Sequence, residues 1–191
     1  ENPVEAPIAV IETLFADEVS EEQKFREAVV LEQKEANDRF KELIDKVSDR
    51  YRENGSMSEK MLGEFIVHNG EVLESAVELG LRKGFTEEEL RRLEVSAVLH
   101  DMTKADAVPE HFKDIPNYAL AIHGEAAGEE SLDILTDEYL ASKGFEGDFE
   151  EIRQEVSRAI REHMGPHPGF MDGILAGVNS RLRESGEPEI T

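Results

Sequence analysis

Apolar residues recur at helical spacing along most of this chain, and this periodicity constrains the fold more than any other feature. Between residues 20 and 52 the apolar positions follow a helical period with some drift, after a capping box that begins at Ser20. Further helices are expected at 58 to 80 or 84, after a capping box at 86–89, at 118–139, at 149–164 and at 168–184. Because we find no convincing strand pattern, the sequence predicts an all-α fold.

The chain is expected to consist of an N-terminal extension and one helical domain. Residues 1–55 contain a strap with two prolines and a long charged helix that ends at Asn54-Gly55. Residues 56–191 form the expected domain, a helical bundle. The first residue is Glu1, which is typical of a fragment or a processed chain, and no signal segment precedes the first helix.

The charge and composition exclude several classes of partner. The formal net charge is -23, so long nucleic acid and anionic membrane surfaces are expected to be repelled. A small phosphorylated substrate stays possible, because a bound cation reverses the local field in a pocket. The absence of cysteine leaves histidine and carboxylate as the strong metal ligands. No apolar run approaches the roughly 20 residues of a membrane span, and a cytoplasmic location is expected.

Four of the helical segments each place a histidine on their apolar face, and one adds an aspartate. These residues are His68, His100, Asp101, His123 and His163. One buried histidine, taken alone, is more often a core residue with a satisfied hydrogen bond than a metal ligand. Four that converge with an aspartate are expected to bind one or two divalent transition-metal ions, namely Fe, Mn, Co, Ni or Zn, because burial without a partner is costly.

The adjacent positions of His100 and Asp101 leave two arrangements open. Neighbouring side chains point about 100° apart on a helix. An ion at the edge of the helix could be reached from both sides. The carboxylate could instead bridge two ions.

The order of these motifs resembles the HD superfamily of metal-dependent phosphohydrolases. Residues 99–104 are similar to its Leu-His-Asp-x-x-Lys signature, and His68 matches the histidine about thirty residues upstream. Residues 122–128, Ile-His-Gly-Glu-Ala-Ala-Gly, and 159–163, Ala-Ile-Arg-Glu-His, resemble its third and fourth histidine motifs. The resemblance covers roughly residues 60–182. It is greatest to the bacterial branch that hydrolyses symmetrical dinucleoside polyphosphates.

The resemblance implies a hydrolase that cleaves a phosphate ester or phosphoanhydride, of a nucleotide or another small phosphorylated metabolite, with a metal-activated water. The four histidines and Asp101 would be the ligands, with Asp101 and Lys104 as the catalytic residues. Lys104 would also hold the substrate phosphate as a point charge. His167, in the loop 165–169, would contact the substrate or donate a proton.

One position departs from the family pattern. The family usually ends its ligand set with an aspartate on the last helix, where this chain has Asn179. An amide is a much weaker ligand for these ions than a carboxylate. Asp172 lies seven residues earlier, on the same helical face, and is expected to replace it as a metal ligand.

Two other functions stay open. A non-catalytic sensor or interaction domain is favoured by Asn179 and the high charge, with the long N-terminal helix relaying binding. An iron-dependent oxygenase uses the same ligand set in some branches, but those tend to lack the lysine at the position of Lys104. The helix at 20–52, rich in Glu and Lys, could also form a homodimer contact.

Overall fold

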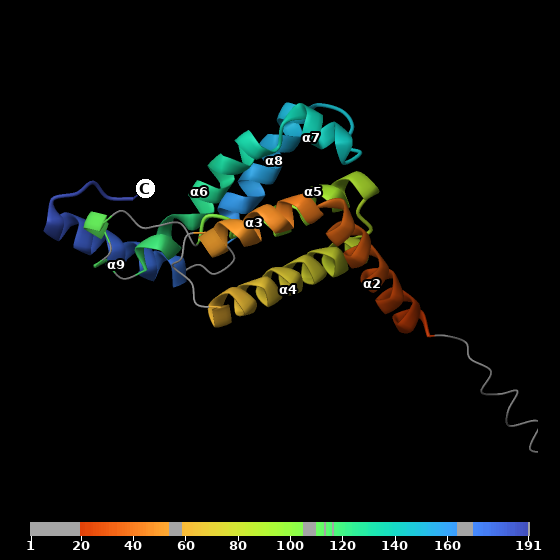
Figure 1. Cartoon of the computed structure of the whole chain (residues 1–191), viewed down its shortest axis with the longest axis horizontal. Helices are drawn as coiled ribbons and strands as arrows, with labels where there is room; N and C mark the ends of the chain where they lie inside the picture. The colour runs from red at the N-terminus through yellow and green to blue at the C-terminus, as the bar shows by residue number, and fades with distance from the viewer. Residues whose placement is uncertain are drawn as a thin grey trace, which may run out of the picture.

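The computed structural model of the chain is an assembly of α-helices (Figure 1). It describes residues 20–53, 59–104, 110–112, 114–115, 117–163 and 170–190. The helices are α2 (Glu21–Arg39), α3 (Lys41–Glu53), α4 (Glu59–Lys83), α5 (Glu87–Leu99), α6 (Tyr118–Ile134), α7 (Asp137–Ser142), α8 (Phe149–Glu162) and α9 (Phe170–Ser185). A short 3₁₀ helix, η1, spans Glu110–Phe112. The described residues contain no strand, so the prediction of an all-α fold is confirmed.

Side chains cap the helices where the sequence indicated. Thr86 and Glu89 form the predicted capping box of α5, in which the Glu89 carboxylate accepts the Thr86 N–H at 2.8 Å. Only half of the predicted box at Ser20 forms: the Ser20 hydroxyl accepts the Gln23 N–H, while the Gln23 side chain donates to Glu27. The strap at 1–19 and the predicted boundary at residue 55 lie outside the described residues.

The single helix predicted for residues 20–52 is wrong, because the chain breaks at Phe40 into α2 and α3. Phe40 has φ -106° and ψ 16°, and its ring is fully buried. The break changes the direction of the chain, so both halves direct apolar residues into the core. These residues are Val29 and Ala36 from α2, and Leu43, Val47 and Tyr51 from α3. The drift of the apolar positions along 20–52 reflects this change of direction.

The helix predicted for residues 118–139 is also divided. α6 ends at Ile134, and Leu135 has φ -85° and ψ 63° while its side chain is fully buried. Thr136 then caps α7 by accepting the Tyr139 N–H at 3.2 Å. The sequence offered this cap as a signal, a threonine before two acidic residues, and the prediction missed it.

One apolar core connects most of the helices. α6 packs along α8, α5 lies between α4 and α8, and the N-terminal helices α2 and α3 pack on α4 and α5. A smaller cluster holds α9 to the start of α6 and to Ile115, and α9 lies at the end of the molecule opposite α2 (Figure 1). Among the described helices, none combines the length and the apolar character that crossing a bilayer requires.

α6 and α8 approach closely because α6 has glycines at the contact. A Cβ atom at Gly128 would lie 2.9 Å from the Ser157 carbonyl oxygen, and it would also collide with the Arg161 side chain. A Cβ at Gly124 would lie 3.3 Å from the Arg161 oxygen and 3.4 Å from Cε1 of His163. The spacing of the two helices, and therefore the distance between their histidines, depends on these glycines.

Replacing Gly128 by alanine is expected to lower the free energy of unfolding by about 1–2 kcal/mol. Overpacking costs about 1–3 kcal/mol, and the better helix propensity of alanine recovers part of it. Gly177 in α9 has no atom within 4 Å of a built Cβ, so Gly177→Ala is the matched control and should stabilise slightly. Urea unfolding of the two variants measures the difference. Equal stability of both variants would contradict the close contact.

Candidate metal centre

The structure brings the four predicted histidines and Asp101 together. His68 comes from α4 and His123 from α6, while His100 and His163 follow the last residues of α5 and α8. Asp101 begins the turn after His100 and is buried. Two groups of three could each hold a metal ion: His68, His100 and Asp101, and Asp101, His123 and His163. Within each group the ligand atoms lie within 4.8 Å of one another.

The Asp101 carboxylate lies between two pairs of histidines. Its Oδ2 atom is 3.6 Å from Nε2 of His68 and 3.4 Å from Nε2 of His100. Its Oδ1 atom is 3.2 Å from Nε2 of His123 and 3.7 Å from Nε2 of His163. Each oxygen therefore faces its own pair of imidazoles. This is the arrangement expected of a carboxylate that bridges two ions, the second of the two possibilities that the sequence left open.

Backbone carbonyls fix the orientation of three of the imidazole rings. In each ring Nδ1 contacts the carbonyl oxygen three residues earlier: His100 with Ala97 at 2.7 Å, His123 with Leu120 at 2.7 Å and His163 with Ile160 at 2.5 Å. Because a carbonyl only accepts hydrogen bonds, each Nδ1 carries the hydrogen. The Nε2 lone pairs of the neutral rings then point toward Asp101 and are free to bind an ion.

The distance between the imidazoles of His123 and His163 indicates whether one metal ion could bind to both. Their Nε2 atoms lie 3.1 Å apart. Two neutral rings would face each other there with lone pairs, which is unfavourable unless a cation lies beside them or one ring takes a second proton. Two nitrogens bound to one tetrahedral ion, each at about 2.0–2.1 Å, lie roughly 3.3 Å apart. The donor set and its spacing therefore fit a divalent transition metal.

Charge around Asp101 is balanced by its neighbours. Burial would raise the pKa of Asp101, but imidazoles that carry a second proton at Nε2 donate hydrogen bonds to its oxygens, and these outweigh burial and hold this pKa well below its usual range. A bound cation would take the place of those Nε2 protons and stabilise the same carboxylate. The Lys104 ammonium also contacts Oδ2, at 2.9 Å. Lys104 and His68 are 36% and 48% exposed, whereas His123 is buried. The Oδ2 side of the cluster is therefore the side open to solvent.

Other predicted site residues do not join this cluster or cannot be placed. Asn179 exchanges two hydrogen bonds of 2.9 Å with the backbone of Ile190, so its amide holds the C-terminal segment. The Asp172 side chain and His167 lie outside the described residues, so their predicted roles stay predictions. The contact of Lys104 with a phosphate also stays a prediction.

Two residues that the sequence did not single out support the ligands from behind. The Tyr51 hydroxyl donates to the Asp101 carbonyl oxygen at 2.5 Å, and the Thr103 hydroxyl donates to the His123 carbonyl oxygen at 2.8 Å. Tyr51 lies four residues after Val47, on the apolar face of α3. Its position suited a core residue, and nothing local indicated the hydrogen bond to a residue fifty positions away.

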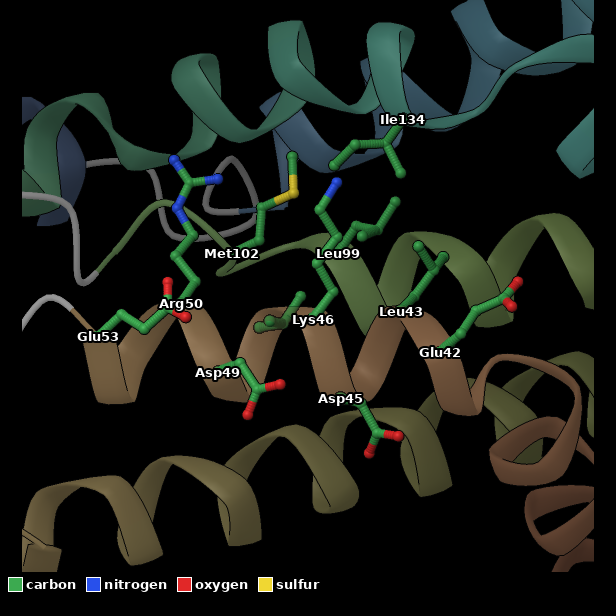
Figure 2. A pocket seen from close by; sticks show the side chains of 11 residues that line it. Glu42, Leu43, Asp45, Lys46, Asp49, Arg50, Glu53, Leu99, Met102 and Ile134 are labelled. Carbon is green, nitrogen blue, oxygen red and sulfur yellow. The ribbon is translucent and has the colours of Figure 1, made fainter.

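A hollow of about 620 Å³ lies between α3 and α6, but its lining does not include the ligand residues. Figure 2 shows Lys46 and Arg50 reaching from α3 toward α6, with Ile134 on the opposite wall. Leu99 and Met102, which flank His100 and Asp101 in the sequence, also line it. The hollow thus lies behind the turn that carries His100 and Asp101, and the histidine cluster lies outside it.

Comparisons with protein-family models, curated proteins and solved structures found no match to this chain. The functional interpretation therefore rests on the geometry of the cluster and on the motifs that compose it.

Proposed function

We propose that this protein is a metal-dependent phosphohydrolase of the HD type. Its substrate would be a small phosphorylated metabolite, such as a nucleotide, whose phosphate ester or phosphoanhydride is hydrolysed. The observation that carries the proposal is the Asp101 carboxylate between two histidine pairs, with each oxygen 3.2–3.7 Å from two Nε2 atoms. The motif at residues 99–104 supports the same conclusion by its resemblance to the family signature.

The chain's own residues would hold the ions and orient the substrate. One or two divalent ions would activate water as a nucleophile near neutral pH and neutralise the phosphate oxygens. Asp101 supplies a buried negative charge shared by both positions, and the rings of the histidines are held by their carbonyl contacts. Lys104 lies on the open side, where its ammonium could turn from Asp101 toward a substrate phosphate.

A non-catalytic sensor is the second candidate. The observation that favours it is the engagement of Asn179 with Ile190, which leaves the family's final ligand position without a side chain free to bind an ion. A sensor would bind metal or ligand at the same cluster without turnover.

The test is hydrolysis of nucleoside mono- and diphosphates and dinucleoside polyphosphates, with Mn, Fe, Co or Ni added. The products are separated by chromatography, because cleavage inside the phosphate bridge of a dinucleoside polyphosphate gives two nucleotides and no free phosphate. Wild type is expected to turn over at least one substrate, and Asp101→Ala to lose at least about 1,000-fold in rate. Asp133→Ala removes an exposed carboxylate from α6 outside the cluster and is the matched control, with full activity expected. Metal binding without turnover of any substrate would reject the hydrolase in favour of the sensor.

A further inference from the structure

Tyr51 makes a buried contact with the turn that carries Asp101. Tyr51 is 1% exposed, and its hydroxyl donates to the Asp101 carbonyl oxygen at 2.5 Å. The same oxygen accepts the Lys104 N–H at 2.9 Å. Because α5 ends at Leu99, this carbonyl lies beyond the regular helix and has no intrahelical partner. Among the described residues, the Tyr51 hydroxyl and the Lys104 N–H are the donors to this oxygen.

The Tyr51 ring also supports the helix that carries His68. It stacks on Phe65 with ring centroids 3.7 Å apart and planes inclined by 23°. Phe65 lies three residues before His68 on α4, and it is buried in the same core. The Tyr51 side chain therefore contacts two segments on the open side of the cluster. These are the turn of α4 that precedes His68, through Phe65, and the backbone of Asp101.

The residue next to Tyr51 connects the same turn of α3 to the opposite side of the centre. Arg50 forms an ion pair with Glu130 of α6, the helix that carries His123 (Figure 2 shows Arg50 reaching toward α6). Consecutive residues at the end of α3 thus contact α4, the Asp101 turn and α6. These are three of the four segments that supply the candidate ligands.

We propose that Tyr51 is a positioning residue for the metal centre, and that the N-terminal helix α3 thereby sets the metal affinity. This inference rests on the metal centre of the proposed function. The carboxylate of Asp101 is at the end of a short side chain, so a rotation of its peptide moves both oxygens relative to the four Nε2 atoms. A ligand set that binds two ions tolerates little displacement of its atoms. Mutation of a residue that orients a ligand typically lowers metal affinity about 10–100-fold.

The test compares Tyr51→Phe with Tyr139→Phe in titrations of the full chain with Co²⁺. Phenylalanine keeps the ring that stacks on Phe65 and removes only the hydroxyl. Tyr139 is the matched control, because its buried hydroxyl has no hydrogen-bond partner among the described residues and its ring packs on the same core. Calorimetry would give the affinity, and the visible absorption of bound Co²⁺ would report the coordination geometry.

Tyr51→Phe is expected to weaken Co²⁺ binding about 10–100-fold and to change the visible spectrum, whereas Tyr139→Phe leaves both unchanged. Circular dichroism of the metal-free variants checks their folding, and sucrose is added if Tyr51→Phe is partly unfolded. Wild-type affinity and spectrum in Tyr51→Phe would overturn the inference and leave the hydrolase untouched. Weakened binding in Tyr51→Phe, together with a wild type that hydrolyses none of the phosphorylated substrates, would support the inference and reject the hydrolase. A wild type that binds no Co²⁺ would overturn both.

Discussion

Replacing Asp101 by asparagine is expected to abolish the binding of divalent ions at both positions of the histidine cluster. Asp101 is the only residue that belongs to both candidate ligand groups among the described residues. Asparagine keeps the shape of the side chain but removes the charge and one of the two oxygens. We expect affinity to fall by more than about 100-fold, the upper range for losing a partner that merely orients a ligand. Calorimetry with Mn²⁺ would measure affinity and stoichiometry together.

The matched control is His68→Asn. His68 contacts only the Oδ2 side and is half-exposed, and partial burial lowers its pKa, which favours the neutral ring. Wild type is expected to bind two equivalents of Mn²⁺ and His68→Asn to retain one, held by Asp101, His123 and His163. Loss of both ions in His68→Asn, or retention of both in Asp101→Asn, would contradict a bridging carboxylate.

A second large effect is expected from Glu94, a fully buried acid on α5 that belongs to neither candidate ligand group. Its carboxylate contacts Arg39 of α2 at 2.5 Å, and Arg39 also contacts Glu32 at 3.3 Å. Burial is the largest influence on Glu94, and although Arg39 opposes it, the pKa rises from 4.5 to about 8. One carboxyl oxygen of Glu94 has no hydrogen-bond partner among the described residues, which agrees with a group that is costly to ionise.

The free energy of unfolding is therefore expected to fall as pH rises from 4.5 to about 8. In this range the folded protein keeps the Glu94 proton and the unfolded chain has lost it. The stabilisation is complete below the unfolded pKa and is lost as pH passes the folded pKa, with an upper limit of about 5 kcal/mol at 1.36 kcal/mol per pKa unit. Above that range the contribution is constant.

Glu94→Gln isolates this effect from the titration of the histidines. The two proteins share every other ionisable group, so the difference between their unfolding free energies reports Glu94 alone. Urea unfolding in a chelator at pH 5, 7 and 9 should show wild type losing stability relative to Glu94→Gln as pH rises. Parallel curves would show that Glu94 stays ionised and paired with Arg39 throughout.

Local signals in the sequence determined the fold class and the members of the cluster. Thr86 and Glu89 cap α5 as predicted, because a capping box needs only residues three positions apart. His100 and His123 are buried because each continues or lies within an apolar helical face, and the nearby residues show that periodicity. His68 also follows the apolar spacing of its helix, but the structure leaves it half-exposed at the edge of the cluster. The position of Asp101 between two histidine pairs agrees with one of the two arrangements that helix geometry allowed.

Contacts between distant residues decided the rest, and these leave no local pattern. The break at Phe40 follows from the need of both α2 and α3 to bury apolar residues against α4 and α5. Tyr51 lies fifty residues from Asp101, so only the packing of α3 on the core could show their hydrogen bond. Asn179 occupies the expected ligand position in the sequence, yet its amide binds Ile190. Helical periodicity specifies which face a residue lies on, whereas only the tertiary structure specifies which partner it meets there.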